Sequence, residues 1–297
     1  MRKFSVIWKM FVVIATLALV PSLNGQAPQA TDDQLATANG NATIHPIGHA
    51  SVQVTWNGKK ILIDPAPNGG GGRGDAAGAA GAGAPAGAGG RGGGRGGGGG
   101  GRGAGGAAPA PSPEALNVFT SLGQPDLILI THTHGDHFNA AVLTAVAGPK
   151  TVLGVPQAVY DGLPDPLKAK ATIMANGDTS TLAGIDVQAV PAYNVTAERL
   201  RNHPAGSGNG YVLNLGGKRL YFAGDTEETP ELKSLANIDV AFLPMNLPFT
   251  QTPEAAAQWV KDFKPKIVYP YHFSNGDLSA FVASVGSTSE VRIRKWY

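Results

Sequence analysis

Three histidines and one aspartate fall within six residues of this chain, and this motif restricts the possible folds more than any other feature. Residues 132–137 read His-Thr-His-Gly-Asp-His. They follow an apolar segment, residues 126–130, that is typical of a short buried strand. Loops at strand ends are where rigid scaffolds commonly present reactive groups. We therefore expect a loop that carries chemistry at the end of a buried strand.

Imidazole and carboxylate groups in this motif match the usual ligands of zinc and related divalent ions. Alternate residues of an extended or tightly turned backbone point the same way. His132 and His134 are therefore placed to bind one ion, and Asp136 and His137 a second. The alternative is a polar surface loop that holds three of the seven histidines of the chain.

Apolar periodicity predicts many strands first, and then strands that alternate with helices. Asn57-Gly58 is a typical two-residue hairpin turn, and Thr252 with Pro253 is typical of a helix start. Strands are expected at 52–56, 60–64, 127–130, 151–153, 171–174, 179–182, 185–190, 211–215, 218–222, 240–243, 266–269 and 291–296. Helices are expected at 114–121, 138–147, 157–162, 230–235, 252–263 and 278–285, with a turn at 164–166. This order matches two sheets packed together with helices outside.

The pattern His-x-His-x-Asp-His resembles the signature of the metallo-β-lactamase-fold hydrolases. The resemblance covers about residues 43–66 and 114–296 and implies an α+β fold, a four-layer αββα sandwich. Two further strings, residues 48–51 (Gly-His-Ala-Ser) and 63–65 (Ile-Asp-Pro), resemble one branch of that superfamily. This branch contains lactonase-like proteins and, more distantly, N-acyl phospholipase D-like enzymes.

The resemblance implies further metal ligands downstream of the motif. Asp225 follows a predicted strand, like the aspartate that bridges two metals in the family, and His272 corresponds to the last histidine of the second metal. The remaining ligand of the first metal is His203, which requires a long polar loop, residues 192–208, to fold back. The alternative is that Asn194 or a water completes that site.

Other residues are expected to support the ligands or the reaction. Asp64 is expected to orient a ligand histidine through its carboxylate, and His49 and Asn194 are expected to lie beside the ligands, whereas His45 is assigned a structural role. Asp136 either binds the second metal or orients the nucleophile. Protonation of the leaving group is assigned to metal-bound water, to Tyr271, or to His203 if that residue is not a ligand.

The predicted function is that of a hydrolase that uses two divalent metal ions, zinc or alternatively manganese. A hydroxide on the metals would attack a small ester, lactone or phosphoester. Two alternatives remain: a catalytically silent, metal-binding member that acts as a binding protein, and a β-lactamase-type amide hydrolase. The expected partner is a small-molecule substrate, with the oligomeric state left open.

Net charge argues against nucleic-acid binding. Three cations at the N-terminus, and four arginines and one aspartate in residues 68–111, account for the basic balance, so the net charge of +2 becomes −4 without them. Residues 68–111 are rich in Gly, Ala and Arg and read as a disordered insertion within the domain at 43–297. Deleting residues 69–106 should preserve activity.

The N-terminus resembles a secretory signal peptide. Residues 1–27 have a basic start, an apolar run at 10–20 and small residues after Pro21. This predicts a periplasmic or secreted protein without stable membrane insertion after cleavage; an uncleaved anchor is the alternative. Residues 28–42 are expected to be a flexible lead-in. The chain has no cysteine, so disulfides, thiolate ligands and lipoprotein attachment are excluded.

Overall fold

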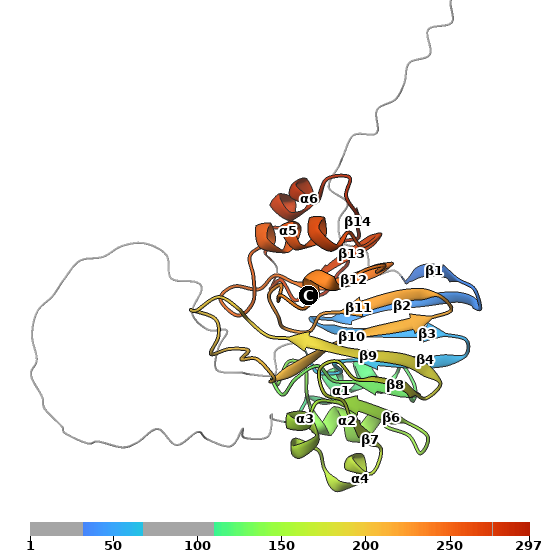
Figure 1. Cartoon of the computed structure of the whole chain (residues 1–297). Helices are drawn as coiled ribbons and strands as arrows, with labels where there is room; N and C mark the ends of the chain where they lie inside the picture. Colours follow the sequence, from blue (N-terminus) through green and yellow to red (C-terminus); the bar gives the residue numbers. More distant parts are fainter. Residues whose placement is uncertain (1–31, 68–109, 275) are drawn as a thin grey trace, which may run out of the picture.

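Two seven-stranded sheets face each other in the computed structural model, which describes residues 32–67, 110–274 and 276–297 (Figure 1). The first sheet runs in chain order: β1 (Asp33–Thr37), β2 (Gly40–Gly48), β3 (Ser51–Trp56), β4 (Lys59–Ile63), β5 (Leu127–Leu129), β6 (Val152–Val155) and β7 (Ala171–Ile173). The second sheet has the order β14 (Glu290–Val291), β13 (Ile267–Tyr271), β12 (Val240–Pro244), β11 (Lys218–Phe222), β10 (Gly208–Leu215), β9 (Ile185–Ala192) and β8 (Thr179–Leu182). Each sheet is antiparallel through its early strands and parallel through its later ones.

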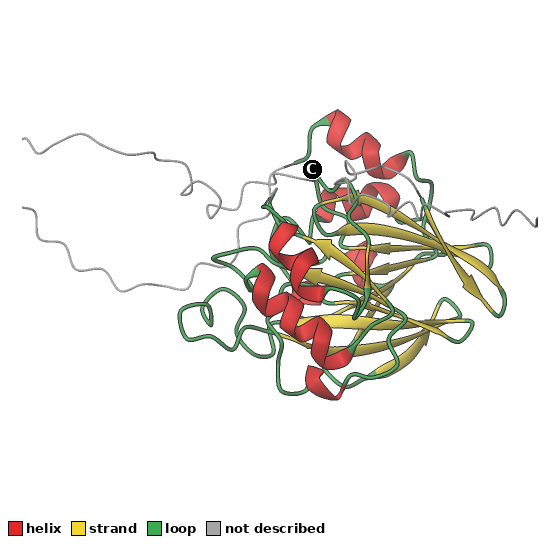
Figure 2. Cartoon of the chain, turned by 90° about the horizontal axis from the view of Figure 1, so that it is seen from above, coloured by secondary structure: helices red, strands yellow, loops and turns green. Residues whose placement is uncertain are grey.

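Helices pack on the outer faces of the two sheets (Figure 2). The first sheet is covered by α1 (Pro113–Thr120), α2 (Ala140–Val146), α3 (Gln157–Gly162) and α4 (Asp165–Lys168). The second is covered over β11–β13 by α5 (Pro253–Phe263), α6 (Ser279–Val285) and the 3-10 turn η1 (Leu232–Ser234). The expected α+β, four-layer αββα sandwich is therefore confirmed. Among the described residues, no helix combines the length and apolar character needed to cross a membrane.

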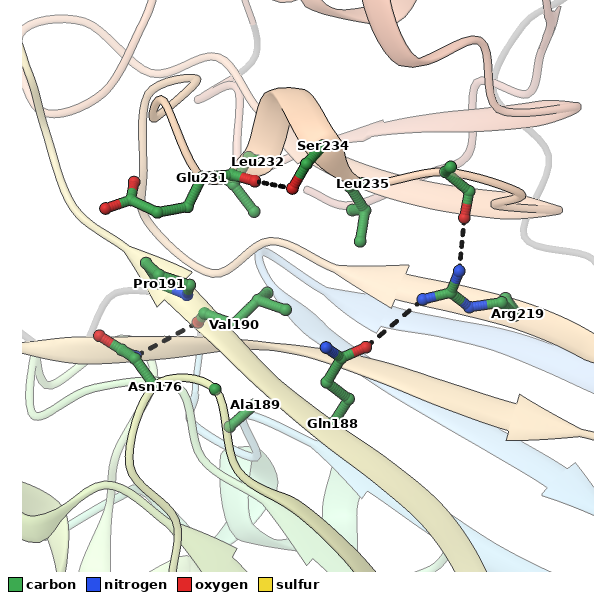
Figure 3. A pocket seen from close by; sticks show the side chains of 12 residues that line it. Asn176, Gln188, Ala189, Val190, Pro191, Arg219, Glu231, Leu232, Ser234 and Leu235 are labelled. Atoms are coloured by element: carbon green, nitrogen blue, oxygen red, sulfur yellow. Dashed lines mark hydrogen bonds between the residues drawn. The ribbon is translucent and has the colours of Figure 1, made fainter.

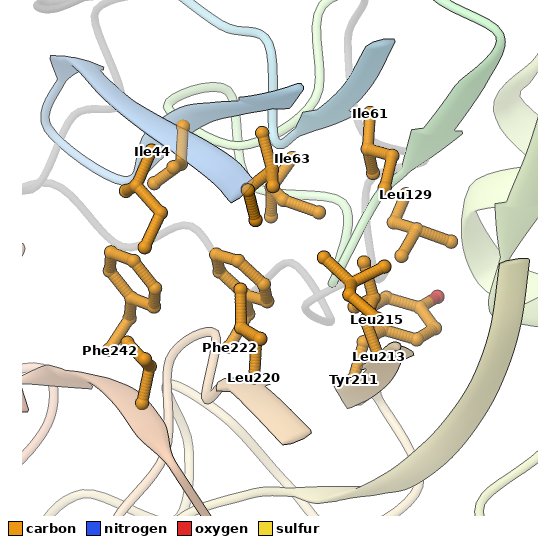
Figure 4. Close-up of a cluster of buried hydrophobic side chains, with 14 of the residues drawn as sticks. Ile44, Ile61, Ile63, Leu129, Tyr211, Leu213, Leu215, Leu220, Phe222 and Phe242 are labelled. Carbon is orange, nitrogen blue, oxygen red and sulfur yellow. The ribbon is translucent and has the colours of Figure 1, made fainter. Parts of the chain in front are cut away.

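Side chains that alternate along the strands fill the space between the sheets. Figure 4 shows Ile44, Ile63 and Leu129 of the first sheet facing Phe222 and Phe242 of the second. The two phenylalanine rings are stacked with centroids 4.5 Å apart. Truncating a fully buried aromatic residue of this kind costs about 3–5 kcal/mol, which makes this layer a rigid support for the loops at its edge.

Helix boundaries follow their capping residues. The Thr252 hydroxyl accepts a hydrogen bond from the amide of Ala255 at the start of α5, and Pro253 occupies the first turn, as the sequence predicts. The helix ends at Phe263, and the capping residue Lys264 adopts a left-handed conformation with φ of 51°.

The structure differs from the sequence prediction at both ends of the described chain. Residues 33–37 form β1, where a flexible lead-in through residue 42 was expected; this lead-in prediction was wrong for the described part. This edge strand is held by backbone pairing with β2 and by the burial of a single large side chain, Leu35. Its sequence is otherwise mostly polar, so no apolar pattern predicted a strand there. The strand expected at 291–296 is reduced to two residues of β14, and residues 292–297 continue as a tail.

Two smaller elements also differ. The turn expected at 164–166 is a single helical turn, α4, and the helix expected at 230–235 is the shorter η1. The predicted signal peptide at 1–27 and nearly all of the insertion at 68–111 lie outside the described residues.

Candidate metal centre

Loops from both sheets meet at one edge of the sandwich. The motif at 132–137 follows β5, and the loops after β9, β11, β12 and β13 reach the same edge. In parallel strands the carboxyl ends share one edge, which is why segments far apart in the sequence converge here. The β2–β3 turn adds His49 from the other end of the chain.

Cluster one consists of His132, His134 and His203. The Nε2 atom of His203 lies 3.2 Å from Nδ1 of His134 and 3.2 Å from Oδ2 of Asp225. The Nε2 atom of His132 is 3.9 Å from the same carboxylate oxygen. One ligand atom from each of these four residues lies within 4.8 Å of all the others.

Cluster two consists of Asp136, His137 and His272. The Nε2 atoms of His137 and His272 lie 3.4 Å and 3.3 Å from Oδ1 of Asp225. His272 Nε2 also lies 3.4 Å from Oδ2 of Asp136. Asp225 therefore faces cluster one with one oxygen and cluster two with the other. The structure brings together all seven residues that the sequence predicted as ligands.

Several buried polar atoms at this centre have no hydrogen-bond partner among the described residues. They are Nε2 of His132, His137 and His272, and Oδ1 of Asp225. A buried polar atom left unpaired is expensive. Three imidazole nitrogens and a carboxylate oxygen that face one another in this way fit divalent cations, since these are their preferred ligands. The donor set therefore suits the metal ions that the sequence predicted.

Charge at the centre favours a cation. Burial lowers the pKa of His137, but the carboxylates of Asp225, Asp136 and Asp64 outweigh this and raise it well above its ordinary value. Burial together with the neighbouring His137 and His134 holds the pKa of His132 well below its ordinary value. The carboxylates of Asp225, Asp136 and Asp64 thus make the surroundings of His137 anionic, whereas His132 is a neutral imidazole. A metal ion would compete with a proton for the imidazole nitrogens.

Asp64 holds the motif from behind, as the sequence predicted. Its Oδ2 atom lies 2.8 Å from Nδ1 of His137 and accepts a 2.7 Å hydrogen bond from the Thr131 hydroxyl, while its Oδ1 atom accepts the Thr131 amide at 2.7 Å. Nδ1 of His132 lies 3.0 Å from the same hydroxyl. A carboxylate that receives the Nδ1 proton leaves Nε2 of the imidazole free to face a metal.

The long loop after β9 does fold His203 into the centre. The Nδ1 atom of His203 lies 3.1 Å from the carbonyl oxygen of Phe249, and this bond directs Nε2 toward cluster one. Asn194 lies outside the ligand group. Its amide donates to the carbonyl oxygens of Phe249 at 2.7 Å and Arg199 at 3.0 Å and lies 3.2 Å from Nδ1 of His203, so Asn194 contacts a ligand from behind and holds the loop.

Glu227 is a supporting residue that the sequence analysis missed. Its buried carboxylate accepts hydrogen bonds from the amides of Val195 and Thr196, each 2.7 Å long, and from Nε of Arg199 at 2.7 Å. It thereby ties the loop that carries His203 to the turn that carries Asp225. Its place two residues after Asp225 was the only available signal, because the residues it contacts are 28–32 positions away.

His272 and its neighbours were also incompletely predicted. Nδ1 of His272 lies 3.0 Å from the amide nitrogen of Asn246, whose oxygen accepts a 3.0 Å hydrogen bond from the Ser274 hydroxyl. Flipping this amide would let its oxygen receive the Nδ1 proton and its nitrogen donate to the Ser274 oxygen, which would leave Nε2 of His272 free as a ligand. Neither Asn246 nor Ser274 belongs to a motif that the sequence analysis recognised.

His49 lies at the site, as expected, and is held by the end of the described chain. Its Nε2 atom lies 2.9 Å from Oδ2 of Asp136, and its ring lies 3.8 Å from that of His272. Its amide donates to the carbonyl of Trp296, and the ring of Tyr297 meets its ring edge-on at 5.6 Å. Its imidazole also falls within reach of cluster two.

Tyr271 is not placed as the proton donor that the sequence suggested. Its side chain is fully buried, and its hydroxyl accepts a 2.8 Å hydrogen bond from the amide of Gly224. Burial and the nearby carboxylates of Asp64 and Asp225 raise its pKa well above the ordinary value. The proton-donor prediction was wrong because the β13 side chain points into the core, where it supports the turn before Asp225.

A surface hollow of about 450 Å³ lies away from the centre, between β9 and η1 (Figure 3). Its charged side chains already have partners. Arg219 bonds to Gln188 and to the carbonyl of Ala236, and Glu231 accepts the hydroxyl of Tyr193. No cluster residue lines this hollow, so the candidate chemistry stays with the metal centre.

Comparison with known proteins agrees with this geometry. Residues 43–272 match the family described as beta-lactamase superfamily domain. A UPF0173 metal-dependent hydrolase of Pyrococcus abyssi is 31% identical over 180 residues, which span 57% of this chain and 78% of that protein. A second UPF0173 metal-dependent hydrolase, from Thermococcus onnurineus, is 35% identical over 182 residues, which span 58% and 80%.

Solved structures show the same fold. A protein of Parabacteroides distasonis, assigned as a metal-dependent hydrolase, superposes with a TM-score of 0.70 at 31% identity, covering 91% of this chain and all of that one. A metallo hydrolase of Ignicoccus hospitalis gives a TM-score of 0.57 at 20% identity, which supports the fold alone. The chain therefore belongs to the metallo-β-lactamase superfamily and is a metal-dependent hydrolase.

Proposed function

We propose that the centre binds two divalent metal ions and that the enzyme hydrolyses a small ester, lactone or phosphoester. The position of Asp225 carries this proposal. One of its oxygens faces cluster one and the other faces cluster two. A carboxylate shared in this way suits two ions a few ångströms apart, the arrangement of binuclear hydrolases. Zinc is our first choice of metal, since imidazole predominates among the ligands, with manganese as the alternative.

Each residue of the centre has a defined task in this proposal. His132, His134 and His203 would hold the first ion, Asp136, His137 and His272 the second, and Asp225 both. When bound, such ions supply Lewis acidity and activate water for attack. Asp64 keeps the Nδ1 proton of His137 in place. His49 contacts Asp136 and restricts the orientation of that carboxylate.

The substrate class rests on the N-terminal strings at 48–51 and 63–65, which resemble the lactonase-like and phospholipase D-like branch. The fold hosts many reactions, so this support is an analogy. Both strings contribute to the centre: His49 lies beside Asp136, and Asp64 beside His137. We further propose export to the periplasm or beyond, on the basis of the signal-like residues 1–27.

Metal content and hydrolysis, measured together, test the proposal. The purified protein and its Asp225→Ala variant are analysed for bound metal and assayed with a phosphodiester and a lactone. We expect two ions per chain, and a rate that falls at least about a hundredfold in the variant. Asp186→Ala is the control, because Asp186 is an exposed residue of β9 whose carboxylate accepts a hydrogen bond from the Thr181 hydroxyl, away from the centre.

Three outcomes would count against it. Absence of bound metal together with equal rates in both proteins would overturn the enzymatic proposal and favour a silent binding protein. One ion per chain would overturn the binuclear centre. Hydrolysis of β-lactams in preference to esters, lactones and phosphodiesters would overturn the substrate class.

A further inference from the structure

Exposed apolar side chains lie on two loops that adjoin the metal centre in the chain. Among the described residues, five large apolar side chains are at least 42% exposed, and three of these lie on the two loops next to His203. They are Val195 and Leu200 on the loop after β9, and Leu247 on the loop after β12, with exposed fractions of 46%, 45% and 51%. Single exposed apolar residues are ordinary, but a group at a functional site is informative.

The two loops are joined to each other and to cluster one. Asn202 donates to the carbonyl of Pro248 at 3.1 Å, and both Asn194 and His203 contact the carbonyl of Phe249. Leu200 and Leu247 each lie within two residues of the bond between Asn202 and Pro248. The loops after β9 and β12, which carry these three residues, therefore lie at the same edge of the sandwich as the metal ligands. We call this pair of joined loops, residues 194–203 and 246–250, the seam; β9 and β12 are labelled in Figure 1.

Hydrogen bonds between its two ends hold the loop that carries Leu247 in a conformation that exposes its tip. The buried residues Asn246 and Thr250 close the loop, because the Asn246 amide donates to the Thr250 hydroxyl and the Thr250 amide donates to the Asn246 carbonyl. The polar ends are thus fixed inside, and the apolar tip of Leu247 and Pro248 is held outside. A loop closed in this way cannot bury its tip without breaking buried hydrogen bonds.

Charge around the seam is balanced. Arg199 is paired with the buried Glu227, and the exposed charges of the loop are Glu198 and Arg201, which have opposite signs. Residues 246–250 carry no charge. This balance gives no net attraction for an anionic group and suits a neutral, apolar one.

We propose that Val195, Leu200 and Leu247 form an apolar rim that binds an aliphatic or aromatic group of the substrate, next to the bond that is hydrolysed. This inference rests on the proposed function and narrows it: the substrate is a neutral ester or lactone with an apolar chain, rather than a phosphodiester. A protein partner would require about 800 Å² on each side, far more than three half-covered side chains offer.

Substrate chain length tests the rim. The rate constant kcat/KM is measured for p-nitrophenyl acetate, butanoate, hexanoate and octanoate, below their aggregation concentrations. A fully buried methylene gives about a fourfold gain, so a rim that covers one side predicts about twofold per methylene. The same series is measured for the double variant Leu200→Ser/Leu247→Ser, in which the slope should fall to nearly zero.

A matched control distinguishes the effect of losing these rim side chains from the general effect of placing serine on the surface. The double variant Val118→Ser/Ile173→Ser changes side chains of similar exposure, 46% and 42%, on α1 and β7. It should keep the wild-type slope. A flat wild-type series, or equal slopes in both variants, would overturn the rim. Thermal unfolding of each variant establishes that it is folded.

A binding measurement distinguishes failure of the rim from failure of the proposed function. Titration calorimetry with butanoate, hexanoate and octanoate reports the dissociation constant without any turnover. Affinity that rises with chain length in the wild type and in the control, and not in the rim variant, supports the rim even if no ester is hydrolysed. Affinity independent of chain length in the wild type overturns it, even if the enzyme is active.

Discussion

At the scale of single residues, the metal ligands depend on small groups packed behind them. Thr131 contacts three of the residues that support the centre. Its hydroxyl links Asp64 to His132, and its side chain lies against Gly224. Gly224 adopts φ of +66°, and a Cβ atom there would lie 2.9 Å from Cβ of Thr131. Glycine is therefore required both by the backbone conformation and by the space before Asp225.

Substituting Gly224→Ala should disturb the centre through this contact. The left-handed conformation alone costs about 1–2 kcal/mol in a residue with a Cβ, and displacing Thr131 adds to it. We expect a loss of about 2–4 kcal/mol in the free energy of unfolding and weaker metal binding, measured by thermal unfolding and metal titration. Gly217→Ala is the control, because Gly217 has φ of +80° with nothing within 4 Å of the added atom. Equal effects of both substitutions on metal affinity would contradict the proposed contact.

At the scale of elements, the loop after β9 is positioned by an anchor outside itself. Glu227, from the turn after β11, accepts hydrogen bonds from the amides of Val195 and Thr196 in this loop. Burial raises the pKa of Glu227, but hydrogen bonds from Thr196, Val195 and Arg199 outweigh this and lower it. The carboxylate is therefore ionised near neutral pH, and it holds the loop with charge-assisted bonds.

Substituting Glu227→Gln should release the loop and weaken cluster one. The change keeps the shape of the side chain but removes its charge and half of its acceptors, so the loop amides and Arg199 compete for one oxygen. We expect metal affinity to fall about ten- to a hundredfold, measured by competition with a chelating dye. Glu231→Gln, at an exposed carboxylate that contacts Tyr193 of the same loop, should have little effect. A similar loss in both variants would count against the anchor.

The tail after β14 is a second element that supports the centre from outside. Tyr297 packs against His49, and its hydroxyl accepts the amide of Ser274, close to Asn246 and His272. We expect Tyr297→Ala to loosen His49 and lower kcat several-fold, by about 1 kcal/mol for the lost ring contact. Lys295→Ala, at an exposed position in the same tail, is the control in the same assay. Unchanged kcat in the Tyr297 variant would remove the tail from this role.

At the scale of the whole molecule, ion pairs join the parallel strands at the edge opposite the centre. Asp239 accepts the amide of Arg219 at 3.0 Å and contacts Nζ of Lys266 at 2.7 Å and of Lys218 at 3.3 Å. Burial raises the pKa of Asp239, but its hydrogen bonds with Lys266, Arg219 and Lys218 outweigh this and lower it.

The stabilising effect of Asp239 should depend on pH. Because its pKa is lower in the folded state, its contribution is fully present above the ordinary value near 3.8 and is lost as the pH falls through the folded-state pKa. At neutral pH, Asp239→Asn should cost about 1–2 kcal/mol in the free energy of unfolding. Denaturant titrations should show this difference shrinking as the pH falls below 3.8. A difference that is independent of pH would contradict the ion-pair explanation.

Residues 68–111, the predicted insertion, separate β4 from β5 in the sequence. The strands on either side of it, β4 and β5, pair in parallel with Ile61, Leu62 and Ile63 opposite Leu127, Ile128 and Leu129. This pairing should hold the domain together without the segment between them. We therefore expect deletion of residues 69–106 to leave ester hydrolysis and the midpoint of thermal unfolding nearly unchanged. Loss of folding in the deletion variant would show that the segment belongs to the domain.

Much of the centre could be predicted from sequence because its ligands follow strands in a fixed order. His132, His134, Asp136 and His137 lie in one short loop, so local backbone geometry already places them together. Asp225 and His272 follow later strands, where the resemblance to the family predicted them. The order of strands and helices matched two packed sheets, and the specific four-layer architecture was implied by the resemblance to the family, although the edge strand β1 was hidden by its polar sequence.

By itself, the sequence determined the motif, the order of the later ligands and the absence of thiol chemistry. The choice between His203 and Asn194 required the three-dimensional structure, because both lie on one long polar loop and the outcome depends on the carbonyl of Phe249 and the carboxylate of Glu227. The structure also showed that Tyr271 is not a proton donor and instead accepts a hydrogen bond from the amide of Gly224, in the turn before Asp225. Such decisions depend on contacts between residues far apart in the chain, and no local pattern encodes them.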